Sequence, residues 1–406
     1  MTFVIKIKKE LAHYYQLPEK TRRLLISFLL YSTAYPMVSI FINAYIWKNN
    51  QNLPSLIAFH MGKFMIVPVI FFINGLLLKI FRINKLSFFG SFVIALGAIS
   101  VVFLNNQTVF NFLSMGLLIG IGTGLYWSNR NYLTIKETDE KNRSYFLGLL
   151  FSYATIIALV VTLSIGWLIV FGLSYQTLMV VAFFLIIASG AIIYSRNYDS
   201  PRIGKLLISR AGFSWNKKRL IHLGLGLVEG LSFFVPSLLI LIMLGNEGIL
   251  GTLTAISSII SSVLIYYYGR KSKPSDHRKY FILSAILSLV FSLLLAIVFN
   301  KLTILIFTLL NGLIINFLWL TFMPIVMKNI DSDTINHEDN RFSYILDSEI
   351  FLNIGRIFSG LVCLAIAYRA GDINALRYSP VLLSVIQVLL FTYIENMKKV
   401  NIKPVI

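Results

Sequence analysis

Charged residues and cysteine are scarce in this chain of 406 residues. Asp, Glu, Lys and Arg make up 13% of it, whereas 57% of its residues are hydrophobic. Soluble domains carry about 25% charged residues, so the composition excludes an ordinary soluble enzyme and a disordered protein. The single cysteine, Cys363, excludes an internal disulfide and a cysteine-based metal cluster. The sequence also lacks a P-loop pattern, so we do not expect ATP to drive it.

Acidic residues are the scarcer of the two charge signs. The chain has 17 acidic and 36 basic residues, which gives a formal net charge of +19. In a soluble protein this excess would suggest a nucleic-acid partner. The lysines and arginines of this chain lie between long uncharged stretches. No nucleic-acid partner is therefore expected.

The uncharged stretches have the length of membrane helices, which need about 20 mostly apolar residues. Leu24–Trp47 fits one such helix, and Leu86–Asn129 and Ser144–Ser195 are each long enough for two. We expect turns at 105–107 and 172–174 inside these two stretches. The other apolar runs lie near 54–78, 220–245, 248–268, 280–299, 302–327, 344–368 and 377–395. The pattern predicts an all-α integral membrane protein with twelve transmembrane helices.

The basic residues predict the orientation of these helices. If both termini are cytoplasmic, 30 of the 36 lysines and arginines fall on the cytoplasmic side. Four fall in the outer turns, and Lys63 and Arg356 lie within predicted helices. This asymmetry follows the positive-inside rule for a protein of the cell membrane.

The longest basic segment lies near the middle of the chain. We interpret 196–219 as a cytoplasmic linker between six-helix bundles at 24–195 and 220–396, with an N-terminal segment at 1–23 and a tail at 397–406. Short matches about 200 residues apart support an internal repeat, with Asn142-Arg143 against Asn340-Arg341 and Gly116-Leu-Leu-Ile against Gly312-Leu-Ile-Ile. Such repeats, with a site between them, are typical of secondary transporters.

Over its whole length the chain resembles the major facilitator superfamily. The segment from Gly75 to Lys85 is similar to the family motif between helices 2 and 3, but Lys79 stands at its acidic position and Arg82 at its second glycine position. The helix-4 arginine of many proton-coupled members and the helix-5 Gly-Pro motif of drug antiporters are not found. The resemblance implies two pseudo-symmetric six-helix bundles, alternating access without a chemical reaction, and a pathway lined by helices 1, 4, 7 and 10.

Charges within the predicted helices are the sharpest functional signal. A charge at a helix centre costs about 2.5–3.5 kcal/mol on insertion scales, so it usually faces a cavity or a partner. The candidates for proton coupling or substrate binding are Glu229, Lys63, His60, Arg356, Glu349 and Asn353. Each has a structural alternative, such as a hydrogen bond between helices for Glu229, snorkelling for Lys63 and a structural role for His60. Arg356 could pair with Glu349 on its own helix or with a residue of the other half.

The predicted cytoplasmic gate consists of Lys79, Arg82 and Asp347. In the family, an acid after helix 2 latches the cytoplasmic side against helix 11. Because Lys79 replaces that acid and Asp347 begins helix 11, we hypothesise a latch of reversed polarity. The alternative is that Lys79 only anchors the loop on the positive side of the membrane.

Uncharged polar residues form further stripes on the helices expected to line the pathway. The candidate pathway-lining residues are Ser32, Tyr35, Ser39, Asn43, Tyr126, Trp127, Ser232, Asn311, Asn316 and Trp319. The alternative for Tyr126 and Trp127 is an interfacial aromatic belt. Pro36 is expected to permit a kink in helix 1. Glycines spaced by four, at 116, 120 and 124, are expected to allow close helix packing.

The function favoured by these patterns is secondary active transport of a small organic solute, with protons as the candidate coupling ion. One alternative is an efflux pump for hydrophobic compounds. A membrane enzyme could use the polar run from Asp331 to Asp339 as a metal site, and a receptor or assembly protein would need no polar pathway. We expect a small-molecule substrate and the lipid bilayer as partners, a monomer, and no cofactor, metal or catalytic residue.

Overall fold

The computed structural model describes residues 14–138, 142–208, 213–271, 276–333 and 341–400. The elements of regular structure in these residues are α-helices. Twelve helical segments within the described residues are long and apolar enough to cross a membrane, so the chain is a multi-pass membrane protein. The all-α fold class and the number of membrane helices are confirmed.

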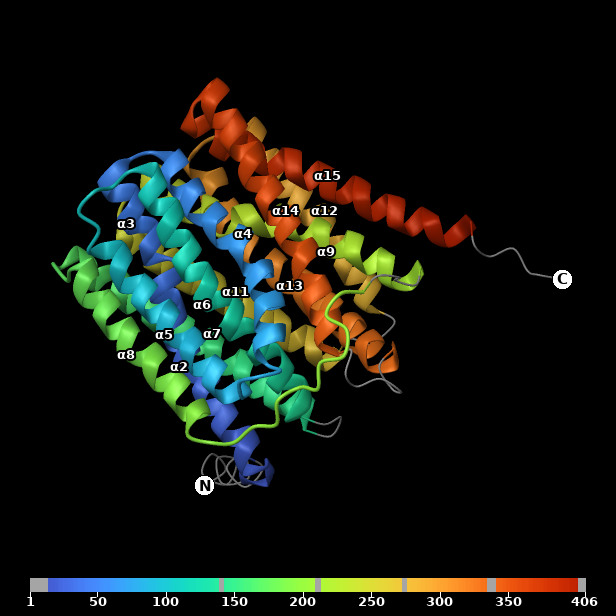
Figure 1. The fold of residues 1–406 in the computed structure, drawn as a ribbon. Coiled ribbons are helices and arrows are strands. Elements are labelled where there is room, and N and C mark those ends of the chain that lie inside the picture. Colours follow the sequence, from blue (N-terminus) through green and yellow to red (C-terminus); the bar gives the residue numbers. More distant parts are fainter. Residues whose placement is uncertain (1–13, 139–141, 209–212, 272–275, 334–340, 401–406) are drawn as a thin grey trace, which may run out of the picture.

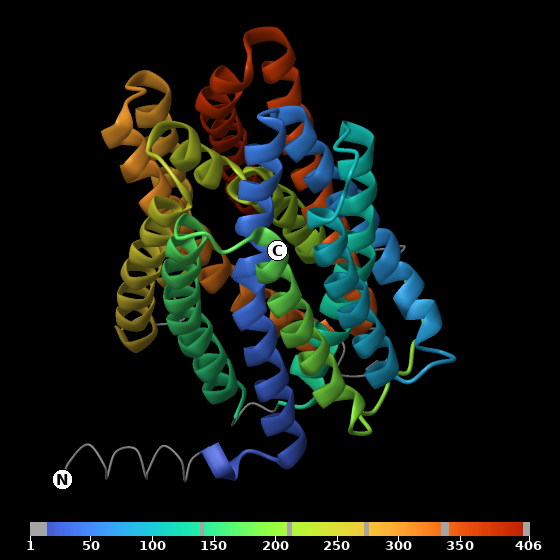
Figure 2. The same cartoon turned by 90° about the vertical axis from the view of Figure 1, so that its left-hand side faces the viewer.

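The first six spans form the left-hand part of Figure 1, coloured blue to green. The first span consists of two helices in line, and Figure 2 shows them as one nearly continuous rod. Helix α4 packs on α6, α5 packs on α6 and α8, and α2 packs on α7 and α8. The helices are α2 (Glu19–Ser39), α3 (Phe41–Asn50), α4 (Leu53–Leu77), α5 (Ile83–Val102), α6 (Val109–Lys136), α7 (Arg143–Val170) and α8 (Tyr175–Tyr194).

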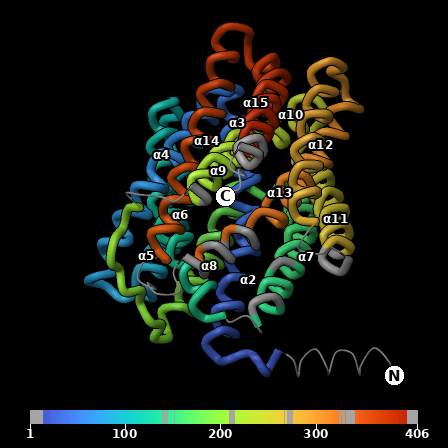
Figure 3. The backbone as a smooth tube through the Cα atoms, turned by 90° about the vertical axis from the view of Figure 1, so that its right-hand side faces the viewer, coloured from blue at the N-terminus to red at the C-terminus, as the bar shows by residue number. Residues whose placement is uncertain are grey.

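The last six spans are coloured yellow to red in Figures 1 and 3. Helix α9 packs on α14 and α15, and α12 packs on α13 and α15. The two halves meet where α4 contacts α14 and where α7 contacts α11. The helices are α9 (Phe213–Ser232), α10 (Val235–Met243), α11 (Glu247–Lys271), α12 (His277–Ile297), α13 (Lys301–Asp333), α14 (Arg341–Ala370) and α15 (Asp372–Val400).

Two faces of the molecule follow from this alternation of spans. The face that carries the chain between α8 and α9 is called the linker face. The opposite face carries the turns at 51–52, 103–108, 171–174, 244–246, 298–300 and 371, and is called the turn face. The expected turns at 105–107 and 172–174 lie within these segments.

Several helix boundaries differ from the sequence interpretation, and two of them change the assignment of a central residue. Helix α6 continues to Lys136, although the sequence placed its end near Asn129. Arg130 therefore lies inside a helix, where its guanidinium is 4.3 Å from the centre of the Trp127 ring. Helix α9 begins at Phe213, within the stretch interpreted as linker. In both cases the helix continues past the first charged residues, because long basic side chains can extend along a helix end.

The first span of each half is interrupted next to a proline. Helix α2 contains Pro36 and ends at Ser39, and α3 begins after Ile40. Helix α9 ends at Ser232, and α10 begins at Val235 with Pro236 in its first turn. Proline lacks a backbone N–H and clashes with the preceding turn, so it interrupts a helix. Where a kink was expected at Pro36, the two helices are separated by Ile40 alone, and backbone hydrogen bonds from Ile40 to Pro36 and from Ala44 to Ile40 continue across this point.

Glycines bring α4 and α6 into close contact. A Cβ at Gly116 would collide with the carbonyl oxygen of Phe59, and one at Gly120 would lie 2.9 Å from that of Lys63. A Cβ at Gly124 would lie 2.7 Å from Ile70. The close packing expected from the spacing of these glycines is therefore observed, and it fixes the helix that carries His60 and Lys63.

A second set of glycines brings α9 and α14 together. A Cβ at Gly226 would collide with the carbonyl oxygen of Leu352, and one at Gly355 with that of Leu223. A Cβ at Gly230 would lie 2.9 Å from the Cα of Arg356. This approach positions Glu229 of α9 beside Arg356 of α14.

Substitution of Gly116 by alanine is expected to destabilise the protein. The added methyl group meets backbone rather than a flexible side chain, and such overpacking costs about 1–3 kcal/mol. The matched control is Gly148→Ala in α7, where a Cβ would have nothing within 4 Å. Thermal unfolding in lipid nanodiscs should show a lower midpoint for Gly116→Ala and an unchanged or higher one for Gly148→Ala. Equal midpoints would contradict the close packing of α4 and α6.

Candidate functional site

A group of mostly covered charges lies between α9 and α14. Arg356 donates from Nη2 and Nε to Glu229 Oε2 at 2.8 and 3.2 Å. Its Nη1 donates to Asn353 Oδ1 at 3.2 Å and lies 3.4 Å from Glu349 Oε1. The side chains of Arg356, Glu229 and Glu349 are 13%, 15% and 18% exposed. Arg356 therefore pairs with its own helix and with α9, and no cross-half ion pair forms through it among the described residues.

Two further hydrogen bonds orient the carboxylates of this group. Trp319 of α13 donates from Nε1 to Glu229 Oε1 at 3.0 Å. Asn353 donates from Nδ2 to Glu349 Oε1 at 2.8 Å. Glu229 thus connects three helices, because its two oxygens accept from α13 and α14. Charge-assisted hydrogen bonds of this kind are stronger than neutral ones.

Lys63 faces this group from the other half of the molecule. Its Nζ lies 5.3 Å from the centre of the Phe233 ring, and the guanidinium carbon of Arg356 lies 5.5 Å from the same ring. Within the part of the chain that the structure describes, Lys63 makes no hydrogen bond or ion pair. A cation over an aromatic ring gains about 0.5–2 kcal/mol, which is less than the about 2.5–3.5 kcal/mol that a charge costs at the centre of a membrane helix.

Lys63 lines a pocket within the N-terminal half, to which the C-terminal half contributes Phe233. The cavity volume is about 30 Å³, and the wider space of about 490 Å³ around it includes open solvent. Its walls are mostly aromatic and aliphatic, with hydroxyl groups between them. The lining residues are Tyr31, Tyr35, Val38, Ser39, Phe59, His60, Lys63, Ile94, Ile119, Thr123, Ile186 and Phe233. We refer to it as the Lys63 pocket.

His60 joins this pocket to the break between α9 and α10. Its Nε2 lies 2.9 Å from Asn43 Oδ1, and Asn43 Nδ2 donates to the carbonyl oxygen of Phe233 at 2.6 Å. Since the Asn43 amide nitrogen is the donor to Phe233, its oxygen accepts from His60 Nε2. His60 Nδ1 is then a buried acceptor without a partner among the described residues. Asn43 therefore supplies a hydrogen bond to a carbonyl at the helix break.

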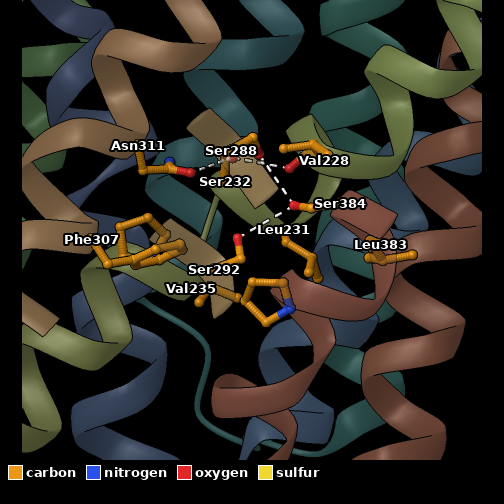
Figure 4. Close-up of a pocket in the computed structure, with 12 residues that line it drawn as sticks. Val228, Leu231, Ser232, Val235, Ser288, Ser292, Phe307, Asn311, Leu383 and Ser384 are labelled. Carbon is orange, nitrogen blue, oxygen red and sulfur yellow. Dashed lines mark hydrogen bonds between the residues drawn. The ribbon is translucent and has the colours of Figure 1, made fainter. Parts of the chain in front are cut away.

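A second pocket lies within the C-terminal half (Figure 4). Ser232 donates to the carbonyl oxygen of Val228 at 2.9 Å and contacts Asn311 Oδ1 at 3.3 Å. Ser384 lies 3.2 Å from Ser288 and 3.3 Å from Ser292, all between hydroxyl oxygens. The structure thus separates Ser232 and Asn311 from Tyr35 and Ser39, which line the Lys63 pocket.

The remaining pathway candidates line neither pocket. Tyr126 is 1% exposed and stacks on Tyr31 with ring centres 4.1 Å apart, so it supports the wall of the Lys63 pocket from behind. Trp127 contacts the Arg130 guanidinium, and Ser32 donates to the carbonyl oxygen of Phe28 on its own helix. The side chain of Asn316 is exposed. Of the aromatic pair, Tyr126 is buried in the protein interior, whereas Trp127 is partly exposed.

The expected contact between Lys79 and Asp347 is absent from this structure. Asp347 accepts from Arg219 at 2.6 and 2.7 Å and from Trp215 Nε1 at 2.7 Å, so its carboxylate is occupied within the C-terminal half. Lys79 is exposed, and Arg82 donates to Asn197 Oδ1 of the linker at 3.0 Å. The sequence interpretation missed Arg219 because it assigned this residue to a solvated linker.

Arg130 is a second central residue that the sequence interpretation missed. Its guanidinium carbon lies 4.7 Å from the Phe28 ring and 6.0 Å from the Tyr31 ring. It was counted among the loop cations that fix orientation. In the sequence, the aromatic residues Tyr126 and Trp127 before it could have indicated that the helix continues.

The polar run considered as a metal site lies outside the described residues, since the side chains from Asp331 to Asn340 are not described. In the part of the chain with described side chains, no group of three or more His, Cys, Asp or Glu residues could hold a metal ion.

Comparisons with known proteins identify the fold. No family model matches the sequence. The uncharacterized protein YqgE of Bacillus subtilis is 24% identical over 396 residues, which cover 91% of this chain and 87% of that protein. An uncharacterized protein from the region 3′ of sodM in Geobacillus stearothermophilus is 29% identical over 119 residues, covering 29% of this chain and 55% of that protein.

Solved transporter structures resemble the chain over nearly its whole length. The POT family transporter PepTSo has a TM-score of 0.69 at 8% identity and covers 94% of this chain and 99% of its own. The nucleoside transporter NupG has 0.65 at 13%, covering 94% and 100%. The human organic anion transporter MFSD10 has 0.62 at 12%, covering 92% and 99%. The chain therefore has the major facilitator fold, as its sequence resemblance predicted.

Loss of Arg356 is expected to cost more stability when Glu229 keeps its charge. In Arg356→Gln, two buried carboxylates lose their shared cation, and breaking a buried ion pair in this way costs about 3–5 kcal/mol. The double variant Glu229→Gln/Arg356→Gln should recover part of this loss in a thermal unfolding assay.

The matched control for this comparison of single and double variants is Arg23→Gln. The side chains of the Arg23–Glu19 pair are 38% and 56% exposed. Exposed pairs contribute about 0–1 kcal/mol, so this variant should unfold close to the wild type. Additive effects of Glu229→Gln and Arg356→Gln would show that the two side chains do not interact.

Proposed function

We propose that this protein is a secondary transporter that moves a small organic solute across the cell membrane by alternating access. The observation that carries the proposal is the buried ion group of Glu229, Arg356 and Glu349 beside the Lys63 pocket, at the junction of the two halves. Buried charges in membrane helices are expensive and typically mark solute or ion pathways. The major facilitator fold supports the same function.

Alternating access requires contacts between the halves that can break and re-form. On the turn face, Lys48 Nζ lies 3.1 Å from Glu247 Oε1, and the backbone N–H of Leu53 donates to Asp372 at 3.0 Å. Deeper in the molecule, Asn43 of α3 donates to the Phe233 carbonyl. These polar contacts are few and non-covalent. They support a turn-face gate that opens when the solute is exposed on that side.

The proposed orientation has both termini and the linker in the cytoplasm. The linker face carries the basic segments between the spans, whereas the turn face carries Lys48, Lys301, Arg369 and Arg377. The positive-inside rule supports this orientation.

Glu229 is the proposed coupling residue for protons. Its charge is shared with Arg356 of α14 and Trp319 of α13. A proton on this carboxylate removes the charge that attracts Arg356, so it weakens the link between α9 and α14. Helix α9 leads directly into the break at Phe233. Proton uptake at Glu229 is therefore coupled to the helix that closes the Lys63 pocket.

The aromatic walls of that pocket favour a second candidate function, efflux of a hydrophobic compound. Tyr31, Phe59 and Phe233 would contact an apolar solute directly. The two functions differ in the direction of gradient-driven movement, which the transport assay below measures.

Transport is tested with the purified protein in liposomes that carry an imposed pH gradient. The vesicles are incubated with a mixture of anionic, zwitterionic, neutral and cationic organic solutes, and mass spectrometry measures which solutes accumulate or are depleted. Protein-free liposomes are the control. At least one solute should move in a protein-dependent manner, and identical contents in both preparations would refute the transporter assignment.

Glu229→Gln should abolish accumulation driven by the pH gradient while leaving solute exchange at equal pH. The amide keeps hydrogen-bonding capacity but cannot carry the proton, so coupling is lost before binding. The control is Glu19→Gln, an exposed carboxylate of the linker face. If Glu229→Gln still accumulates solute against its gradient, Glu229 is not the coupling residue.

A further inference from the structure

The geometry points to a substrate class: we propose that the solute is an organic acid with an apolar body, whose anionic group binds Lys63. This inference rests on the proposed transport function and assigns the Lys63 pocket as the binding site.

Arg356 already donates hydrogen bonds to other side chains of the protein. Its three guanidinium nitrogens donate to Glu229, Glu349 and Asn353. An anionic solute would have to displace these partners, which are held by further hydrogen bonds from Trp319 and within α14. Arg356 is therefore the structural cation of the centre.

Lys63 is the cation available to a solute. It lines the pocket, and its ammonium lies over the Phe233 ring and makes no hydrogen bond or ion pair within the described residues. An ammonium group has three hydrogens to donate and loses its hydration inside a membrane protein. A carboxylate, sulfonate or phosphate oxygen would satisfy these donors, and a second cation would not.

The half of the protein that contains Lys63 offers it no acidic side chain within its spans. Residues 20–136 contain no Asp or Glu at all, and neither do residues 141–198. The acids that approach the centre, Glu229 and Glu349, both come from the C-terminal half and accept from Arg356. The N-terminal wall of the pathway is therefore purely cationic.

Charge balance supports a single negative charge on the solute. With both carboxylates ionised, the charges of Glu229, Glu349, Arg356 and Lys63 cancel. When Glu229 carries the coupling proton, the four groups sum to one positive charge. A monoanion restores neutrality, so solute and proton are favoured together. A cationic solute would leave two uncompensated charges in a medium of low dielectric constant.

The walls of the pocket select for the rest of the solute. Aromatic and aliphatic side chains, among them Tyr31, Phe59 and Phe233, surround the space next to Lys63. They favour burial of a flat or branched apolar group. His60 Nδ1, a buried acceptor without a partner in the described residues, marks a position where a solute donor or a water would be held.

Arg130 also favours a negatively charged solute, because it lies on the side of the Lys63 pocket that leads to the linker face. The Tyr31 ring lines the Lys63 pocket and also lies 6.0 Å from the Arg130 guanidinium. Arg130 makes ring contacts with Phe28 and Trp127 and no ion pair among the described residues. An anion that leaves the pocket past Tyr31 therefore meets a second cation.

The test measures binding of matched probes to the full-length protein in lipid nanodiscs. The probes are benzoate, benzylamine and benzyl alcohol, together with 2-naphthoate, 2-naphthylmethylamine and 2-naphthylmethanol as a larger set. Thermal unfolding at increasing probe concentration gives an apparent affinity for each. At least one acid should raise the unfolding midpoint of the wild type, and its matched amine and alcohol should not.

Lys63→Gln should weaken binding of that acid by about tenfold or more, which corresponds to about 1.4 kcal/mol. Lys63→Arg, which keeps the charge, should recover part of the affinity. The control is Lys301→Gln, an exposed lysine of the turn face. Unchanged acid binding in Lys63→Gln, preference for an amine or alcohol, or no binding of either acid would each overturn the assignment.

The solute mixture in liposomes separates this inference from the proposed function. Protein-dependent movement of an amine or a neutral solute, with none of an acid, keeps the transporter and refutes the organic acid. Absence of any protein-dependent movement refutes the transporter itself. Movement of acids that is lost in Lys63→Gln supports both.

Discussion

The interruption of the seventh span at Phe233 is the constraint on which the centre of the molecule depends. A helix break leaves backbone groups without their usual partners, and an unsatisfied buried carbonyl costs about 1–3 kcal/mol. Asn43 of the other half supplies the missing hydrogen bond at 2.6 Å, and His60 orients Asn43. The Phe233 ring then lies against both Lys63 and Arg356. One break therefore joins the halves and places one aromatic ring beside both central cations.

The two halves differ in how their central charges are paired. In the C-terminal half, Glu229 and Glu349 share Arg356, and glycines at 226, 230 and 355 let α9 and α14 approach closely enough for these contacts. The N-terminal half contributes Lys63 without a matching acid. The junction of the halves is therefore asymmetric in charge, and a solute that completes the pairing on one side can influence how the halves meet.

Much of the fold could be predicted from the sequence because its determinants are local. Uncharged runs gave the twelve spans, and the spacing of Gly116, Gly120 and Gly124 predicted the packing of α4 and α6. The central charges were found because charge inside a span is rare. Their partners were harder to predict, because Glu229 and Arg356 are 127 positions apart and helix rotation decides which residues meet. Arg219 and Arg130 were wrongly assigned to loops, because a basic residue near the end of a helix cannot be told from a loop residue by charge alone. The roles of these side chains in transport stay predictions.

The proposed transport cycle requires the halves to separate at the Asn43–Phe233 junction. Spin labels at Phe103 and Leu302, which are exposed on the turn face of opposite halves, can measure this separation by electron paramagnetic resonance after Cys363→Ala removes the native cysteine. Asn43→Ala removes the hydrogen bond to the Phe233 carbonyl. The account predicts a second, longer distance population in this variant. A single distance distribution, unchanged from that of the protein with Asn43 intact, would contradict it.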